Sequence, residues 1–405
     1  MGQAKAVKRP RRKDAARTGS GWLDGLRVIE VAHGVAGPFC GVTMTQLGAR
    51  VIKVEPPEGD LSRRLGPFPK DIPHPEKSAI FHTLNRGKES ITLDLQAARG
   101  RQALKRLVSN ADVVISDHRP SERTAIGLDF APLHADHPRL TLTSITTFGQ
   151  KGPYAEYKGY DVTASAAGGF SIGAGLPDRE PLAVPYDVCD FQGGQAAFCA
   201  TMMALLARDS TGEGQHVDIA TEEVLSCLHM GNLAVTYIYR GVAGIRAGHR
   251  TGLGIYPRTI LPCKDGHVSI TFLRREEWFK FVELMGNPEW SKEPRYQDLR
   301  AMSEKYPDEA DAQLLPWLAR YTKQEIFAMC QERHIPVAPV LTIDEVATNL
   351  HLRARGLFST YTAPGMPHFD VPRLPWLANG EGFASTHPAP RLGQHTQKIL
   401  QEFKA

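Results

Sequence analysis

The sequence contains no long apolar run, no C-x-x-C pair and no large excess of charge of one sign. The apolar stretch at residues 198–207 is far shorter than the ~18 residues that would span a membrane. The 6 cysteines show no repeated spacing, which argues against both a zinc site and a disulfide framework. We therefore expect no membrane segment, no metal site, and reduced thiols in a cytoplasmic protein.

Charge is concentrated at the N-terminus. The first 17 residues carry seven basic groups and one acid, so the rest of the chain has a net charge of −2 within the total of +4. The run "KRPRRK" (8–13) is compatible with a nucleic-acid or nuclear-targeting patch. A solvated, disordered basic tail over residues 1–20 is the favoured interpretation, and a nucleic-acid partner is not expected.

Two β-rich apolar runs near the start of the chain flank a glycine-punctuated segment. The runs "LRVIEVA" (26–32) and "RVIKVE" (50–55) lie about 30 residues apart, which is typical of a βαβ unit and predicts a parallel sheet. Further strands are expected at 112–116 and within 139–149. The first 150 residues are therefore predicted to form an open α/β domain, and 405 residues allow a second, smaller unit.

Two short motifs invite enzymatic interpretations that their context disfavours. Glu55 follows Gly34 by 21 residues, as a ribose-binding acid does in dinucleotide-binding proteins. However, "GVAGPFCG" is not G-x-G-x-x-G, and Pro38 removes a backbone amide. "GFSIG" (169–173) matches the serine-hydrolase elbow at Ser171, but no strand is expected before it and a turn follows it.

Two aspartates precede the apolar helical run predicted at 196–209. An aspartate just before a helix usually caps it, so we expect at least one of Asp187 and Asp190 to be a helix cap. Helix amides would also keep such a carboxylate ionised with a lowered pKa, and thus suited to act as a nucleophile. Gly193 and Gly194 are unfavourable in a helix and are expected to leave space above the carboxylate for a bulky group.

Several ordered blocks together resemble the class III coenzyme A (CoA) transferases, which include formyl-CoA and carnitine-CoA transferases, with α-methylacyl-CoA racemase as a close relative. The matching blocks span residues 25 to about 225 and continue near the C-terminus: "GLRVIEVAHGVAGPFC", "LGARVIKVEPPEGD", "LNRGKESITLDL", "ADVVISDHRPSERTAIGLDF", "SITTFGQKGPYAEYKGYD", "ARDSTGEGQHVDIATEE", "PVAPVLTIDEV" (336–346) and "RLGQHT" (391–396).

The resemblance implies an α/β fold with a Rossmann-like open parallel sheet, a smaller α+β domain and an interlocked homodimer. It places the large domain at 21–225, a linker helix at 226–244, the small domain at 245–335 and the return to the large domain at 336–405.

The resemblance also implies an activity and a site. Asp190 stands at the family's catalytic position and would move CoA from an acyl-CoA to a small carboxylate through aspartyl anhydride and aspartyl-CoA intermediates. CoA and acyl-CoA would be substrates, with no tightly bound cofactor. The candidate CoA contacts are Gly34, Val35, Ala36, Arg86, Lys88, Asp117, His118, Arg119, Arg123 and Tyr160.

A racemase or isomerase acting at the α-carbon of a 2-methylacyl-CoA is the alternative. Its partner histidine is replaced here by Tyr160, a poor proton carrier at neutral pH, which favours the transferase. Val35, Pro56 and Asp117 replace a glutamine, an arginine and an asparagine of formyl-CoA transferase, so formate or oxalate exchange is not the expected reaction.

Overall fold

The computed structural model describes residues 21–228, 237–238, 241, 246, 248–250, 254–385 and 387–404. These residues form two compact units. The first comprises 21–164, 187–225 and 355–404, and the second comprises 165–186 and the described part of 226–354. The return to the first unit thus begins at 355 rather than at the predicted 336, and residues 165–186 belong to the second unit. The basic tail and most of the predicted linker helix lie outside the described residues.

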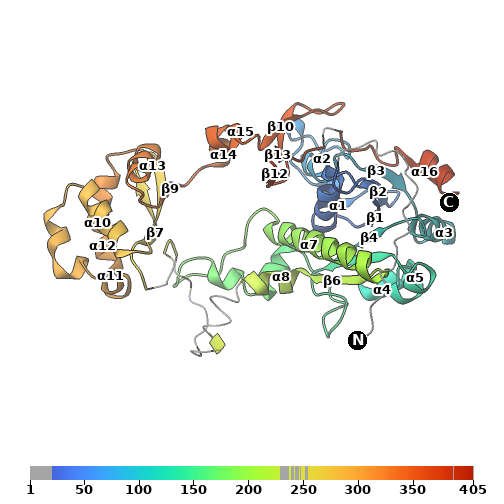
Figure 1. The fold of residues 1–405 in the computed structure, drawn as a ribbon, viewed down its shortest axis with the longest axis horizontal. Coiled ribbons are helices and arrows are strands. Elements are labelled where there is room, and N and C mark those ends of the chain that lie inside the picture. Colours follow the sequence, from blue (N-terminus) through green and yellow to red (C-terminus); the bar gives the residue numbers. More distant parts are fainter. Residues whose placement is uncertain are drawn as a thin grey trace, which may run out of the picture. The chain divides into compact units, whose positions relative to one another are not determined.

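The first unit is built on a six-stranded sheet (Figure 1). Its strands are β1 (Arg27–Val31), β2 (Arg50–Glu55), β3 (Glu89–Thr92), β4 (Val113–Ser116), β5 (Thr141–Thr146) and β6 (His216–Ala220). Every adjacent pair is parallel, and the order is β3-β2-β1-β4-β5-β6. The predicted Rossmann-like parallel sheet is therefore present. Successive strands are added on one side of β1 up to β3 and on its other side from β4 onward, so the strand order reverses between β1 and β4, which is where such folds bind ligands.

Helices cover both faces of this sheet because its strands are apolar on both sides. One face carries α1 (Ala36–Gln46) and α7 (Val188–Thr211), with Val28 of β1 in their shared core. The other face carries α3 (Ala98–Val108), α5 (Phe130–Asp136) and α16 (Thr396–Glu402), with Ile29 and Val31 in that core. The other α-helices and strands of this unit are α2 (Ala79–Asn85), α4 (Pro120–Ala125), α6 (Asp161–Ala167), α8 (Thr221–Leu228), β10 (Phe358–Tyr361), β11 (Phe369–Pro372), β12 (Leu377–Ala378) and β13 (Glu381–Gly382). Helices α6 and α8 each begin in the first unit and end in the second.

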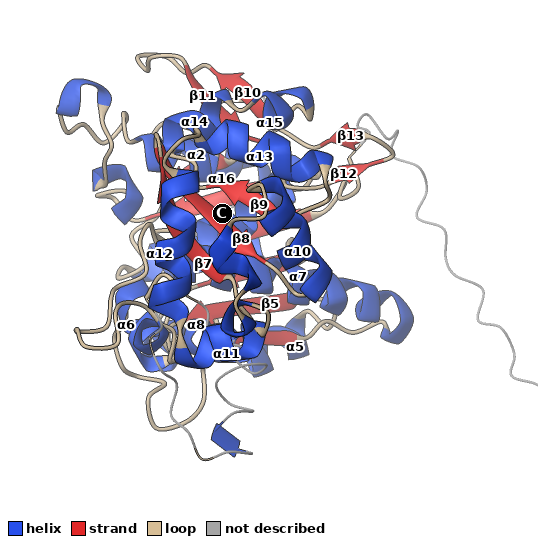
Figure 2. Ribbon diagram, turned by 90° about the vertical axis from the view of Figure 1, so that its left-hand side faces the viewer, coloured by secondary structure: helices blue, strands red, loops and turns tan. Residues whose placement is uncertain are grey.

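The second unit holds a three-stranded antiparallel sheet (Figure 2). Its strands are β7 (Arg258–Cys263), β8 (Gly266–Thr271) and β9 (Val337–Pro339), and its principal helices are α10 (Arg275–Leu284), α11 (Leu299–Lys305), α12 (Pro307–Leu318), α13 (Lys323–Glu332), α14 (Ile343–Thr348) and α15 (Leu350–Ala354). Trp278, Phe281 and Ile326 are fully buried in its core. This unit therefore has a core separate from those of the first. In the described part of the chain, no helix is long and apolar enough to cross a membrane.

Candidate active site

Asp190 lies in the first turn of α7. This helix begins at Val188, eight residues earlier than predicted, and Asp187 precedes it with a left-handed φ of 51°. The side chain of Asp187 accepts no capping hydrogen bond. Instead, Oδ1 of Asp161 accepts a 2.9 Å hydrogen bond from the backbone N–H of Asp190. Asp161, which the sequence analysis did not single out, therefore satisfies an amide at the start of α7.

The surroundings of Asp190 disfavour its charge. Burial and, to a smaller extent, the negative charges of Asp161, Asp187 and Asp117 together raise its pKa from the ordinary aspartate value to about 7. The expectation of a lowered pKa was wrong, because the carboxyl group is buried and the negative charges of three other carboxylates repel its own. At neutral pH the carboxyl group is therefore close to its titration midpoint.

Gly193 and Gly194 serve close packing instead of leaving space for a ligand. Both residues are buried. A Cβ on Gly194 would lie 2.5 Å from the carbonyl oxygen of Ala36, and a Cβ on Gly193 would lie 2.9 Å from Oγ1 of Thr221. The expectation of open space above the carboxylate was wrong. Gly194 lets α7 pack against the start of α1, beside the loop that follows β1, and Gly193 lets it pack against the start of α8.

That loop contains Gly34, Val35 and Ala36, three of the predicted CoA contacts. Gly34 has a φ of 68°, which favours glycine, and Ala36 begins α1. The preceding residue, His33, donates its backbone N–H to Oδ2 of Asp117 over 2.8 Å, and its Nδ1 lies 3.4 Å from Oδ1 of the same carboxylate. Burial lowers the pKa of His33, but Asp117 outweighs burial and the net pKa is raised. Asp117 thus links the loop after β1 to the end of β4.

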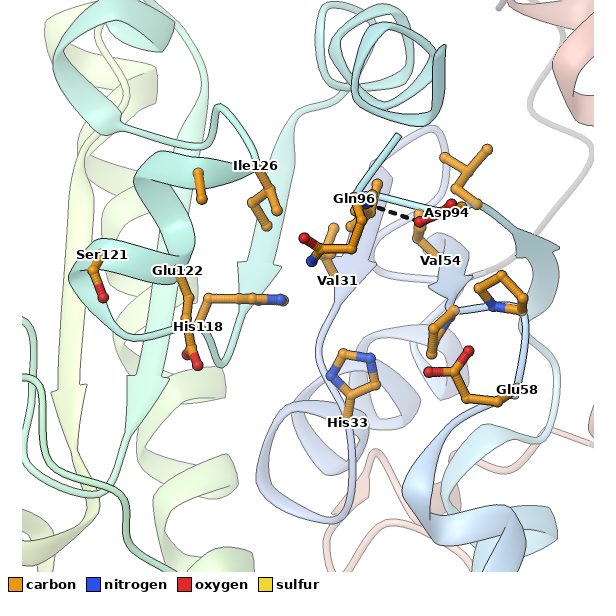
Figure 3. Close-up of a pocket in the computed structure, with 15 residues that line it drawn as sticks. Val31, His33, Val54, Glu58, Asp94, Gln96, His118, Ser121, Glu122 and Ile126 are labelled. Carbon is orange, nitrogen blue, oxygen red and sulfur yellow. Dashed lines mark hydrogen bonds between the residues drawn. The ribbon is translucent and has the colours of Figure 1, made fainter. Parts of the chain in front are cut away.

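A cleft of about 690 Å³ opens at the carboxyl edge of the sheet, between the loops that follow β1, β2, β3 and β4 (Figure 3). His33 and His118 face into it with their ring centroids 5.8 Å apart. The cleft lies at the reversal of strand order, the usual place for a nucleotide-like ligand in such folds. It is lined by Val31, His33, Val54, Pro56, Pro57, Glu58, Leu93, Asp94, Leu95, Gln96, His118, Ser121, Glu122, Ala125 and Ile126.

Three further predicted contacts lie near this edge with differing surroundings. Arg119 forms an ion pair with Glu122, which lines the cleft. Arg123 is largely covered and lies 3.6 Å from Asp129, so its charge is already partnered. Tyr160 is 71% exposed and immediately precedes Asp161, whose Oδ1 accepts the hydrogen bond from the backbone N–H of Asp190.

Arg86 and Lys88 do not support their predicted role as phosphate contacts. Nζ of Lys88 is buried and donates to Glu30, to the carbonyl of Pro38 and to Asn85 over 2.8 to 3.0 Å. The guanidinium of Arg86 is bonded within the protein, including a 2.7 Å bond to the carbonyl of Pro372. The sequence showed two basic residues in a family block, and only tertiary structure shows that both are enclosed.

The surroundings of Glu55 and Ser171 do not fit the dinucleotide-binding and serine-hydrolase motifs that the sequence suggested for them. Glu55 is fully buried and accepts hydrogen bonds of 2.7 and 2.8 Å from Arg63, so it is not placed to bind a ribose. Ser171 lies in a short 3-10 turn and shares a 2.7 Å hydrogen bond with Ser165, without the strand-to-helix turn of a hydrolase elbow.

A parallel sheet with a cleft at its switch point is typical of α/β proteins that bind ligands at this edge, and a carboxyl group of raised pKa at the start of α7 is typical of an active site. The model of CoA-transferase family III matches residues 23–396, and the chain belongs to this family of enzymes.

The similarity to named relatives and to a solved structure extends over nearly the whole chain. A succinate–glutarate CoA-transferase of Agrobacterium fabrum is 31% identical over 94% of this chain and 96% of its own length. A succinyl-CoA–D-citramalate CoA-transferase of Chloroflexus aurantiacus is 31% identical over 94% of this chain and 93% of its own. The crystal structure of a CaiB/BaiF family protein from Brucella suis superposes with a TM-score of 0.83 at 33% identity, over 95% of this chain and 99% of that one.

Proposed function

We propose that this protein moves CoA from an acyl-CoA thioester to an acceptor carboxylate, with Asp190 as the nucleophile. The observation that carries the proposal is a carboxyl group with a pKa of about 7 in the first turn of α7, beside the loop at the cleft. A carboxylate of raised pKa is more basic, hence more nucleophilic, than an ordinary aspartate, and it is still substantially ionised at neutral pH.

The proposed exchange needs only this carboxylate and the two substrates. Asp190 attacks the thioester carbonyl, the carbon–sulfur bond breaks, and a mixed anhydride and CoA thiolate result. The thiolate attacks the aspartyl carbonyl of the anhydride, which releases the donor's carboxylate and leaves an aspartyl-CoA thioester. The acceptor carboxylate then attacks this thioester, the carbon–sulfur bond breaks, and a second mixed anhydride and CoA thiolate result. The thiolate attacks the acceptor's carbonyl in this anhydride, the bond to Asp190 breaks, and the new acyl-CoA and free Asp190 are formed.

We place the nucleotide end of CoA in the cleft of Figure 3. Its walls include the imidazoles of His33 and His118, and the adjacent start of α1 offers backbone amides at Val35 and Ala36 to an anion. Arg119 remains a candidate phosphate contact, since its ion pair with Glu122 is at the surface and its partner is a cleft residue.

Trapping of the covalent intermediate tests this function. The protein is incubated with succinyl-CoA, chosen because relatives carry succinyl donors in their names, and is then treated with hydroxylamine or borohydride before peptide mapping. We expect the label on Asp190, its loss in Asp190→Asn, and its retention in the matched control Asp187→Asn. A panel of acyl-CoAs and carboxylates then defines the substrates. A mapped label elsewhere, with turnover intact in Asp190→Ala, would contradict the proposal.

The alternative is racemisation or isomerisation at the α-carbon of a 2-methylacyl-CoA. The pKa of about 7 at Asp190 also suits a carboxyl group that both gives and takes a proton. This alternative predicts incorporation of deuterium at the α-carbon from D2O without any acceptor carboxylate. Tyr160 at the partner position favours the transferase, which predicts no such exchange.

We further propose that the protein is a homodimer, as the family resemblance implies. On α7, Met203 and Leu206 are 69% and 72% exposed, an unusual exposure for two large apolar side chains one turn apart. A second copy of the chain that covers this face would remove them from water.

A further inference from the structure

The loop between β1 and α1 is held at successive backbone groups by side chains from other segments. The carbonyl oxygen of Ala32 accepts a 2.8 Å hydrogen bond from Nζ of Lys53, on β2. The N–H of His33, on the other side of the same peptide unit, donates to Asp117. The N–H of Gly34 donates to Oδ1 of Asp60 over 3.2 Å. The loop's conformation therefore depends on three charged side chains that are distant in sequence.

Two of these three side chains form a buried ion pair. Nζ of Lys53 lies 2.7 Å from Oδ2 of Asp60, and both side chains have no exposed surface. Lys53 also donates to Glu30 over 2.9 Å, while Asp60 accepts 2.7 and 2.6 Å bonds from the N–H and hydroxyl of Ser62. Further hydrogen bonds thus hold both members of the pair in place, with Lys53 bonded to Glu30 and Oδ1 of Asp60 bonded to Ser62.

The ion pair connects two walls of the cleft. Lys53 and Asp60 contact Ala32 and Gly34, which flank the cleft residue His33. Asp60 also ends the segment 56–60, whose first three residues line the cleft from the side of β2. Because one pair holds both segments, a change in the pair would alter the cleft on both sides.

A contribution to stability alone would not explain the choice of these residues. Val28 and Val51 fill the same face of β1 and β2 one step earlier, so this layer accommodates apolar side chains. Replacing a buried ion pair by apolar residues is often neutral or stabilising, because the charges must lose their hydration. On this face of β1 and β2, the charged pair Glu30 and Lys53 follows the apolar pair Val28 and Val51 in the direction of the cleft.

We propose that Lys53 and Asp60 are positioning residues that hold the loop 32–36 in the conformation that binds the CoA substrate. The proposal rests on the proposed function, since it assigns CoA to this cleft. It predicts that loss of the pair weakens CoA binding and raises KM for the acyl-CoA more than it lowers kcat.

The test compares Asp60→Asn with Asp112→Asn. Asp112 is a matched control at the opposite, amino-terminal edge of the same sheet: its Oδ2 accepts the N–H of Arg27, on β1, over 3.0 Å, and its Oδ1 lies 3.3 Å from Arg208. Both substitutions therefore remove a carboxylate charge that holds a backbone amide and pairs with a cation. Isothermal titration with CoA, steady-state kinetics and hydrogen exchange of the unliganded protein are measured on each variant.

We expect Asp60→Asn to weaken CoA binding tenfold or more and to speed amide exchange in the peptide that covers 32–36, while Asp112→Asn changes the CoA dissociation constant less than twofold. If Asp60→Asn does not fold, the same measurements are made on the double variant Lys53→Met/Asp60→Asn, which leaves the net charge unchanged. We expect the same loss of CoA binding and the same faster exchange at 32–36. Equal effects of the two sites on CoA binding, or unchanged exchange at 32–36, would overturn the proposal. A wild-type protein that binds no CoA would refute the proposed function, and hydrogen exchange would still decide whether the pair holds the loop.

Discussion

Replacing Asp190 by asparagine should make the folded protein more stable at alkaline pH. An aspartate has an ordinary pKa of 3.8 in the unfolded chain, and burial with three neighbouring carboxylates raises it to about 7 in the fold. The unfolded chain loses its proton first as pH rises, so this group lowers the stability of the folded protein increasingly between about pH 4 and pH 7. Asparagine has a similar shape and no charge, so it avoids this cost.

The magnitude follows from about 1.4 kcal/mol per tenfold change in proton affinity. The difference between 3.8 and about 7 corresponds to roughly 4 kcal/mol above pH 7, an upper bound because the carboxyl group is partly exposed and screened by water. We expect Asp190→Asn to gain about 2–4 kcal/mol over wild type at pH 8 and about 1 kcal/mol at pH 5.

Urea unfolding at the two pH values measures this difference. The matched control is Asp187→Asn, since Asp187 is exposed and close by, and it should change stability by less than about 1 kcal/mol at either pH. An equal effect of Asp190→Asn at pH 5 and pH 8, or a loss of stability at pH 8, would refute the reasoning that this carboxyl group is held against its charge.

Three further predictions concern catalysis, packing and assembly. If Asp190 must be ionised to attack, kcat should fall about tenfold per pH unit below about pH 7 and level off above it, and a pH-rate profile that is flat from pH 5 to pH 8 would exclude this role. Gly194→Ala should lower stability by about 1–3 kcal/mol, because its Cβ would meet the carbonyl oxygen of Ala36 at 2.5 Å, and a thermal melt unchanged from wild type would contradict this packing. Replacing Met203 and Leu206 by lysine should convert a dimer to monomer in sedimentation experiments, and a dimer that survives the double substitution would place the interface elsewhere.

Strands β1, β2, β4 and β5 of the first unit were predicted because their signals are local, whereas β3 was not. A run such as "RVIKVE" is apolar, β-branched and bounded by glycine or proline, and the strand β2 occupies those residues. The start of α7 was predicted eight residues too late, since Gly193 and Gly194 are poor helix formers. Their helical conformation is stabilised by packing against α1 and α8, contacts between segments far apart in sequence.

The electrostatics of the site were not predictable in the same way. Helix position alone predicted an ionised Asp190, whereas its pKa depends on Asp161 and Asp117, which lie 29 and 73 positions away in the chain. Lys88 appears in the sequence as one basic residue in a family block, but in the fold it is enclosed by Glu30 and the start of α1. A pKa reports the sum of nearby charges and burial, and neither is local in sequence.

Ordered blocks and strand patterns are properties of the chain, so the family and the parallel α/β sheet could be predicted from them, and the order of motifs predicts Asp190 as the nucleophile. Tertiary structure alone decided which charged residues face the cleft, which are buried, and how Asp60, Asp117 and Asp161 act on the loop after β1 and on Asp190. The physical reason is that charge interactions depend on distance and burial, and folding brings together carboxylates that the sequence keeps apart.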